Sequence, residues 1–203
     1  TGVMEDGQRT VLGTSVSLSE AEVHWRNFLL DLKKRGLHGL QLITSDDHSG
    51  LKAALTSVFP SVPWQRCQVH LQRNAVAYVP KMDMRKGVAN DIRNIFNAPD
   101  KAEAQRLLDL SIEKYKKTAS KLSEWMETNI PEGFAIFAFP ENQRKKLRST
   151  NMVERLNREI KRRTRVATLF PNEASLLRLV SAILSETSEE WETGRRYLPK
   201  EDS

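Results

Sequence analysis

Two carboxylates are the residues of this chain best placed to support catalysis, and the first of them is Asp46. It falls at the end of Leu40–Ile43, a short apolar run that predicts a buried strand. Parallel α/β sheets bind their ligands at the carboxyl ends of strands. A plain loop acid is the alternative for Asp46, and the neighbouring Asp47 is predicted to cap a helix that begins near Ser49.

The second carboxylate, Glu154, lies in the most basic segment of the chain, Arg144–Arg165. This segment holds ten Lys or Arg against two acids, a net charge of +8, whereas the whole chain carries +6. Charge concentrated at one place predicts a docked polyanion. In a helix that follows Asn151, Glu154 would lie beside an apolar stripe that includes Leu156. The alternative is that Asn151 is the N-cap and Glu154 completes a capping box at position N3.

Cys67 and His70 have the spacing of half a zinc site. The chain has no second cysteine, and its three other histidines show no partner spacing. A structural zinc site is therefore disfavoured. The sequence favours Cys67 as a small buried residue on a strand predicted over Trp64–Val69, with His70 supporting the site by a hydrogen bond.

Composition places the chain among globular proteins. Of its 203 residues, 39% are hydrophobic and 29% are charged, which suffices for a sizeable core. No apolar run approaches the ~18 residues of a membrane span, and no signal-peptide pattern opens the chain. A single cysteine excludes an internal disulfide framework and fits the reducing cytosol. We therefore expect a cytoplasmic protein without a membrane partner.

The pattern of elements predicts an α/β fold in three parts. In residues 1–80, a hairpin of Thr1–Met4 and Thr10–Val16 precedes alternating helices and strands, which favours a mixed sheet with parallel pairing after the hairpin. Ser19 opens a capping-box pattern at the start of the first helix. Residues 81–140 show only helical periodicity and predict an all-α insertion. Residues 141–203 return to the core with the basic helix and a last amphipathic helix.

A carboxylate after a strand and another on a cation-rich helix could hold divalent metal against phosphate. Mg²⁺ takes carboxylate and phosphate oxygens, and two such ions can activate a nucleophile and stabilise the leaving oxygen. Lys161, two turns beyond Glu154, would lie over the adjacent phosphate. The other cations of the helix would hold the substrate backbone without reading its sequence.

Three motifs connect these residues to a known family. They are SDDHSGL at 45–51, WQRCQVHLQRN at 64–74 and STNMVERLNREIKRRTR at 149–165. With these motifs in this order, most of the chain resembles the catalytic domain of bacterial insertion-sequence transposases of the Mutator type. These are DDE recombinases with an RNase H-like fold, and their partners are DNA at the transposon ends and at the target.

The resemblance implies a role for each candidate residue. Asp46 would be the second catalytic Asp and Glu154 the catalytic Glu, and both would ligate Mg²⁺ or Mn²⁺. The expected phosphate contacts are Arg155, Arg158, Lys161, Arg162 and Arg165. Near-site support is expected from Cys67, His70 and Asn157.

The first catalytic Asp of the family lies on an upstream strand that this sequence lacks. Asp6 is in a Glu-Asp-Gly turn and does not replace it. We therefore expect an N-terminally truncated fragment with an incomplete two-ion site and little or no cleavage activity of its own, and we expect the full-length protein to be a homo-oligomer. A structure-selective nuclease of the same fold and a non-catalytic DNA-binding or regulatory relic are the alternatives.

Overall fold

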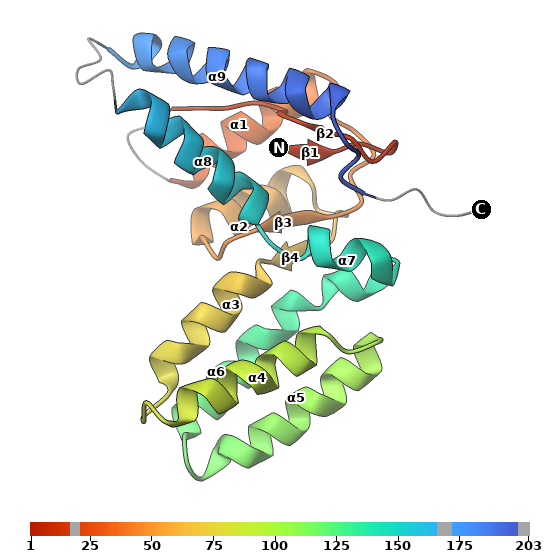
Figure 1. Cartoon of the computed structure of the whole chain (residues 1–203), viewed down its shortest axis with the longest axis vertical. Helices are drawn as coiled ribbons and strands as arrows, with labels where there is room; N and C mark the ends of the chain where they lie inside the picture. The colour runs from red at the N-terminus through yellow and green to blue at the C-terminus, as the bar shows by residue number, and fades with distance from the viewer. Residues whose placement is uncertain (17–20, 166–171, 199–203) are drawn as a thin grey trace. The chain divides into compact units, whose positions relative to one another are not determined.

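The computed structural model describes residues 1–16, 21–165 and 172–198, and the chain divides into two compact units (Figure 1). What we term the helical unit consists of Gln41–Asp47 and Val62–Thr150. What we term the terminal unit consists of Thr1–Leu40, His48–Ser61 and Asn151–Ser203. Each unit therefore contains segments from distant parts of the sequence.

Two short strands form the sheet of the helical unit. β3 (Ile43–Ser45) pairs in parallel with β4 (Trp64–Arg66), with Ile43 opposite Trp64 and Ser45 opposite Arg66. The Trp64 indole Nε1 donates a hydrogen bond of 2.8 Å to Ser45 Oγ. This pair carries the first candidate catalytic residue at the end of β3.

Helices make up the rest of the helical unit. They are α3 (Gln68–Ala75), η1 (Val76–Tyr78), α4 (Met84–Phe96), α5 (Lys101–Lys116), α6 (Ser120–Asn129), η2 (Ile130–Gly133), η3 (Ala135–Ala138) and α7 (Glu141–Leu147). Their apolar faces form one core that includes Leu71, Ile92, Leu108 and Met126. Residues 81–140 are helices and turns without a strand. That they form an insertion in the α/β core remains a prediction.

In its described residues, the terminal unit combines a small hairpin with four helices. β1 (Gly2–Val3) pairs antiparallel with β2 (Arg9–Thr10). The helices are α1 (Glu22–Lys34), α2 (Ser49–Val58), α8 (Asn151–Thr164) and α9 (Glu173–Thr193). α1 and α2 pack together, and α8 packs on α9. The α8–α9 contact is built on Leu156, Val180 and Leu184, which are all buried.

The strands are shorter than the sequence predicted. β2 ends at Thr10, not Val16, because the backbone beyond it bonds to side chains. Val11 N donates to Ser188 Oγ at 3.1 Å, and Arg35 Nη2 donates to Leu12 O at 2.8 Å. The run predicted over Leu40–Ile43 becomes a strand only from Ile43, where the register with β4 begins.

The observed class is α/β, rich in helix and with small sheets. Where the sequence predicted one mixed sheet, the strands of the described residues form two sheets of two strands each. Directly after β2, side chains take the backbone hydrogen bonds that would extend its ladder. The RNase H-like assignment stays a prediction. Ser19 lies outside the described residues. None of the described helices has both the length and the apolar character needed to cross a membrane.

Candidate functional site

The candidate site begins at the edge of the sheet where β3 and β4 both end. Asp46 directly follows β3, and Cys67 directly follows β4. Because the strands are parallel, their carboxyl ends meet at the same edge. Cys67 N donates a hydrogen bond of 2.8 Å to Ser45 O, which links the end of β3 to the residue that follows β4. Asp46 therefore lies at the strand end where its sequence context predicted it.

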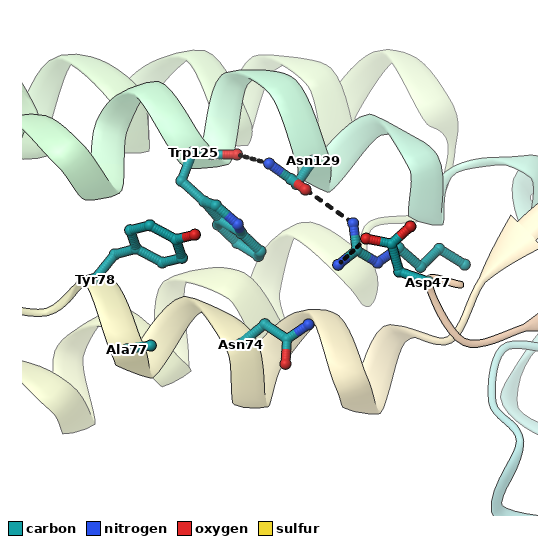
Figure 2. A pocket seen from close by; sticks show the side chains of 7 residues that line it. Asp47, Asn74, Ala77, Tyr78, Trp125 and Asn129 are labelled. Carbon is teal, nitrogen blue, oxygen red and sulfur yellow. Dashed lines mark hydrogen bonds and ion pairs between the residues drawn. The ribbon is translucent and has the colours of Figure 1, made fainter. Parts of the chain in front are cut away.

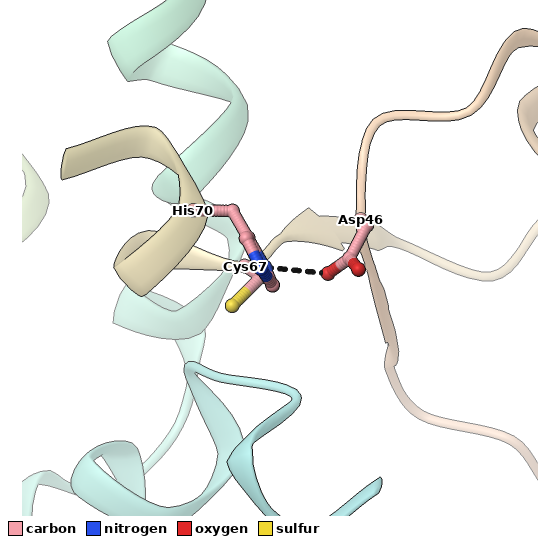
Figure 3. Close-up of side chains that lie close together, drawn as sticks. All are labelled: Asp46, Cys67 and His70. Carbon is pink, nitrogen blue, oxygen red and sulfur yellow. Dashed lines mark ion pairs between the residues drawn. The ribbon is translucent and has the colours of Figure 1, made fainter. Parts of the chain in front are cut away.

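The carboxylate of Asp46 is held through one of its two oxygens. His70 Nδ1 lies 2.7 Å from Asp46 Oδ1 (Figure 3). Thr150 Oγ1 donates to the same oxygen at 3.1 Å. Asp46 Oδ2 accepts no hydrogen bond from the described residues, and the Asp46 side chain is 55% exposed. One oxygen is thus fixed in place while the other stays available to a ligand.

Cys67 is buried at the start of α3 and is not on a strand as predicted, because β4 ends one residue earlier. As the N-cap residue of α3, it precedes His70 by three positions, so both side chains come from the first turn of one helix. The Cys67 sulfur accepts hydrogen bonds from Thr150 N and Thr150 Oγ1, both at 3.4 Å. Thr150 therefore contacts both Cys67 and Asp46.

A buried arginine fixes the residue after Asp46. The Arg66 side chain is only 3% exposed, and its guanidinium lies 3.0 Å from Asp47 Oδ2 and 2.8 Å from Glu132 Oε2. It also donates to Asn129 Oδ1 at 2.8 Å, and Asn129 in turn donates to the Trp125 carbonyl (Figure 2). A buried guanidinium needs such partners for its donors. Asp47 is therefore an ion-pair partner rather than the predicted helix cap.

The cap of α2 is His48, whose Nδ1 accepts a hydrogen bond from Leu51 N at 3.4 Å. Asp47 and Arg66 instead border a cavity of about 410 Å³ in the helical unit. The aromatic wall of this cavity is formed by Tyr78 and Trp125, stacked with ring centroids 5.4 Å apart. The cavity thus lies beside the residue that follows Asp46.

The second candidate carboxylate, Glu154, lies half-buried in the first turn of α8 in the terminal unit. The helix begins at Asn151 itself, so Asn151 is not the N-cap and Glu154 is one position beyond N3. The predicted capping box is wrong for this reason. Leu156 is buried as predicted, whereas Val153 is 36% exposed, at the margin of the buried face.

The cations of α8 fall into two groups. Arg162 and Arg163 both pair with Glu159 at 2.7 Å, and Arg163 also pairs with Glu186 of α9. These hydrogen bonds lower the pKa of Glu159 to about 2. Arg158 and Lys161 are exposed, and their side chains make no hydrogen bond or ion pair within the described chain.

Arg165 and Asn157 are exposed like these two cations, and Arg165 likewise has no side-chain partner in the part of the chain that the structure describes. Arg155 is also exposed. Its charge and that of Arg9 oppose the rise that burial causes in the pKa of Tyr197. Three of the five predicted phosphate contacts therefore present a cation with no partner inside the described protein.

Comparison with known proteins agrees with the motifs. The family model described as "Transposase, Mutator family" matches residues 1–194. The chain belongs to this family. It is 55% identical over 197 residues to the transposase for insertion sequence element IS406 of Burkholderia multivorans, an alignment that covers 97% of this chain and 51% of that protein.

Other members are also transposases of insertion sequences. The transposase for ISRM5 of Rhizobium meliloti is 40% identical, over 99% of this chain and 50% of that protein. The transposase for IS256 in transposon Tn4001 of Staphylococcus aureus is 35% identical, over 97% of this chain and 51% of that protein. The chain spans about half the length of the curated relatives it matches.

Metal binding was expected from the resemblance to this family, and the described residues fit the expectation in part. Asp46 Oδ2 is an exposed oxygen ligand of the kind that Mg²⁺ takes. Cys67 and His70 offer sulfur and nitrogen, which Mg²⁺ does not favour. Their contribution toward a magnesium ion would be to fix Asp46. Asp46, Cys67 and His70 come together within the helical unit, whereas Glu154, Asn157 and the cations of α8 belong to the terminal unit.

Sequence reasoning missed two residues that shape this site. Thr150 was quoted only as part of a motif, and its contacts with Asp46 and Cys67 span 104 and 83 positions. No local periodicity signals such a contact. Arg66 carried a weak signal, because an arginine inside a predicted buried strand needs a counter-charge. Its partner Glu132 is 66 positions away and could not be named from the sequence.

Proposed function

We propose that this chain is the part of an insertion-sequence transposase that carries the catalytic carboxylates Asp46 and Glu154 in an RNase H-like core. Its substrate would be DNA. Water would attack a phosphodiester at the transposon end and release a 3′-hydroxyl. That hydroxyl would then attack a phosphodiester of target DNA, forming the new strand joint and releasing a target 3′-hydroxyl.

The observation that carries the proposal is the state of the Asp46 carboxylate at the end of a parallel strand. His70 Nδ1 and Thr150 Oγ1 fix one oxygen, and the other is exposed and without a hydrogen bond from the described residues. A carboxylate held in this way loses less conformational freedom when it binds a ligand. Cys67 would support this arrangement indirectly, because it contacts Thr150.

Asp46 and Glu154 are the residues that would hold Mg²⁺ or Mn²⁺, which when bound would polarise the phosphate and lower the pKa of a water. The protein's own contribution is to bind the DNA backbone. Arg158, Lys161 and Arg165 would make the phosphate contacts, with Arg155 and Arg162 beside them and Asn157 near the site. The complete protein would act as a homo-oligomer on DNA in the bacterial cytoplasm.

The test uses a protein that joins this chain to the remaining half that its relatives possess. Asp46→Asn and Glu154→Gln should each lower strand transfer by at least roughly 100-fold in Mg²⁺ or Mn²⁺. DNA affinity should stay unchanged or rise slightly, because a negative charge near phosphate is removed. Joined and merely cleaved products, separated on a denaturing gel, distinguish a transposase from a nuclease.

The matched control is Asp109→Asn, which removes an exposed carboxylate of α5 whose Oδ1 accepts a hydrogen bond from Gln105. This variant should keep wild-type activity. Wild-type strand transfer by either Asp46→Asn or Glu154→Gln, with normal folding, would rule out the assigned carboxylates.

A further inference from the structure

Three side chains with different ligand atoms converge at the carboxyl edge of the β3–β4 pair. Asp46 offers a carboxylate oxygen, Cys67 a sulfur and His70 an imidazole nitrogen (Figure 3). These atoms all lie within 4.8 Å of one another. Among the described residues, they form the group of three His, Cys, Asp or Glu side chains that could share a metal ion.

This ligand set suits a borderline transition metal better than Mg²⁺. Thiolate and imidazole select zinc and its neighbours, whereas Mg²⁺ prefers oxygen alone. Three protein ligands with a fourth position open to water are a frequent arrangement for Zn²⁺ outside purely structural sites. The sequence alone argued against zinc because it supplied only Cys67 and His70. The fold supplies the third ligand, Asp46, from a different strand.

The geometry needs little adjustment to receive an ion. Zinc bonds of ~2.0–2.3 Å in a tetrahedron place ligand atoms roughly 3.3–3.8 Å apart. The present distance of 2.7 Å between His70 Nδ1 and Asp46 Oδ1 would have to open by about 0.6 Å, because Zn–N and Zn–O bonds are at the short end of that range. Asp46 would have to move away from His70 Nδ1, while Cys67 and His70 both lie in the first turn of α3.

Hydrogen bonds around the sulfur also match those of a metal-bound thiolate. Thr150 N donates to Cys67 Sγ at 3.4 Å, and the single proton of Thr150 Oγ1 is shared between Cys67 Sγ at 3.4 Å and Asp46 Oδ1 at 3.1 Å. Such outer contacts orient a ligand and compensate its charge when a metal is bound. The site thus combines Cys67 and His70 from one helix turn, the partly exposed carboxylate of Asp46, and a threonine that contacts both Asp46 and Cys67.

We propose that Asp46, Cys67 and His70 bind one Zn²⁺ ion, with water as the fourth ligand, and that this ion withdraws Asp46 from catalysis. The binding claim stands on the geometry alone, whereas the inhibition rests on the function proposed for Asp46. Zinc would then inhibit strand transfer by occupying a carboxylate that the reaction requires.

Binding is tested with Co²⁺ as a spectroscopic substitute for zinc on the purified chain. One equivalent of Co²⁺ should produce a sulfur-to-cobalt charge-transfer band in the near ultraviolet and intense visible bands typical of tetrahedral coordination. Zn²⁺ should displace it, and Mg²⁺ in excess should not. A titration that reaches its end point without the sulfur band would overturn the proposal.

Variants identify the ligands. Cys67→Ser should abolish the charge-transfer band, and His70→Gln and Asp46→Asn should each weaken Co²⁺ binding by about 10- to 100-fold. His24→Gln, which changes an exposed histidine of α1, is the matched control and should bind as wild type. Circular dichroism of each variant verifies folding, and His70→Gln keeps the test decisive if the buried Cys67→Ser fails to fold. Wild-type affinity in His70→Gln would exclude the site.

Inhibition is measured separately on the longer protein. Strand transfer in Mg²⁺ should fall at least tenfold when Zn²⁺ saturates the site. Wild type, Cys67→Ser and His70→Gln are each compared with their own activity without zinc, so that differences in basal rate do not affect the comparison. If Co²⁺ binds through Cys67 but Zn²⁺ does not inhibit, the metal site stands and the catalytic role of Asp46 is contradicted.

Discussion

The arginines of the two units differ in their surroundings and therefore in what they contribute to the protein. Arg66 of the helical unit is 3% exposed and satisfies its charge with Asp47, Glu132 and Asn129. In the terminal unit, Arg158 of α8 and Arg165 directly after that helix are exposed and make no ion pair within the described chain. Arg66 therefore contributes to the stability of the fold, whereas Arg158 and Arg165 remain available to bind another molecule.

This difference separates stability from binding. Removing a buried guanidinium leaves its acidic partners without a counter-charge, so the cost falls on folding. Removing an exposed cation without a partner costs the fold little, and its effect appears only with a polyanion present. Net charge cannot make this distinction, because both kinds of arginine count equally toward the total of +6.

The largest expected effect is that of Arg66→Met. Because Asp47 and Glu132 are 41% and 28% exposed, water offsets part of the loss. We expect the free energy of unfolding to fall by about 3 kcal/mol. Urea unfolding in a Trp25→Phe/Trp191→Phe background isolates the fluorescence of Trp64 and Trp125 in the helical unit. Arg158→Ala should change this stability by less than about 0.5 kcal/mol, and equal effects would erase the distinction.

The second prediction concerns the cations without partners. The triple variant Arg158→Gln/Lys161→Gln/Arg165→Gln should lower affinity for duplex DNA by roughly 10- to 100-fold at ~0.15 M salt. The slope of log affinity against log salt should shrink by about 2.7, because each phosphate contact contributes ~0.9. Fluorescence anisotropy over a series of salt concentrations measures both quantities.

The control for that experiment removes three exposed cations that do have partners. Arg35, Arg106 and Lys116 pair with acids three or four positions earlier in the chain, and changing all three to Gln alters net charge by the same amount. This control should change the slope by less than ~1. If both triple variants weaken binding equally, DNA affinity depends on net charge alone, and the assignment of phosphate contacts to Arg158, Lys161 and Arg165 is wrong.

An intermediate effect is expected at Asp91, a carboxylate of α4 that is 22% exposed and accepts from Tyr115 and Lys114. Tyr115→Phe should lower the free energy of unfolding by about 1 kcal/mol, measured by urea unfolding at pH 7. Tyr78→Phe, at an exposed tyrosine, should be neutral by comparison.

The Tyr115 contribution should also depend on pH. Burial, and then the hydrogen bond to Asp91, raise the pKa of Tyr115 above its ordinary value of 10.0. The contribution is therefore complete below pH 10 and is lost as pH rises through the folded pKa. A difference between Tyr115→Phe and wild type that grows above pH 10 would contradict this assignment.

The smallest effect is expected from Glu159, the half-buried acid of α8 that pairs with Arg162 and Arg163. Hydrogen bonds from Arg162 and Arg163 lower its pKa from 4.5 to about 2. The stability it contributes is complete above about pH 5 and is lost as pH falls through about 2. Glu159→Gln should therefore destabilise the protein slightly at pH 6 and less at pH 3, as measured by urea unfolding. In an Arg162→Gln/Arg163→Gln background this pH dependence should vanish, and its persistence would point to another group.

Strong helical periodicity made part of this fold predictable. The helix expected to begin near Ser49 does begin there, and residues 81–140, for which only helical periodicity was expected, are helices and turns without a strand. The place of Asp46 after a parallel strand was also predictable, because it depends on a local apolar run and on the order of elements.

Contacts between distant segments were not predictable. Strand ends shifted by several residues because side chains such as Ser188 took over backbone hydrogen bonds. The contacts of Arg66 with Glu132, of Thr150 with Asp46, and of Asp46 with Cys67 each join residues that are tens of positions apart in the sequence. A single sequence shows which residues could pair, but tertiary packing selects which do. The candidate site was therefore found by residue type and position, while its supporting contacts were not.

The end of α7 and the residues that follow it affect the order in which the protein folds. Leu147 O accepts from Thr44 Oγ1, Arg148 O accepts from Gln68 N, and Thr150 bonds to Asp46 across 104 positions. Closing so long a loop is entropically costly until the intervening helices have collapsed. During synthesis, His70 can reach Asp46 early, but Thr150 can join only after the helices have left the ribosome. The surroundings of Asp46 would thus be completed among the last steps of folding, and nascent chains that stop within the helices would carry an unfinished carboxylate.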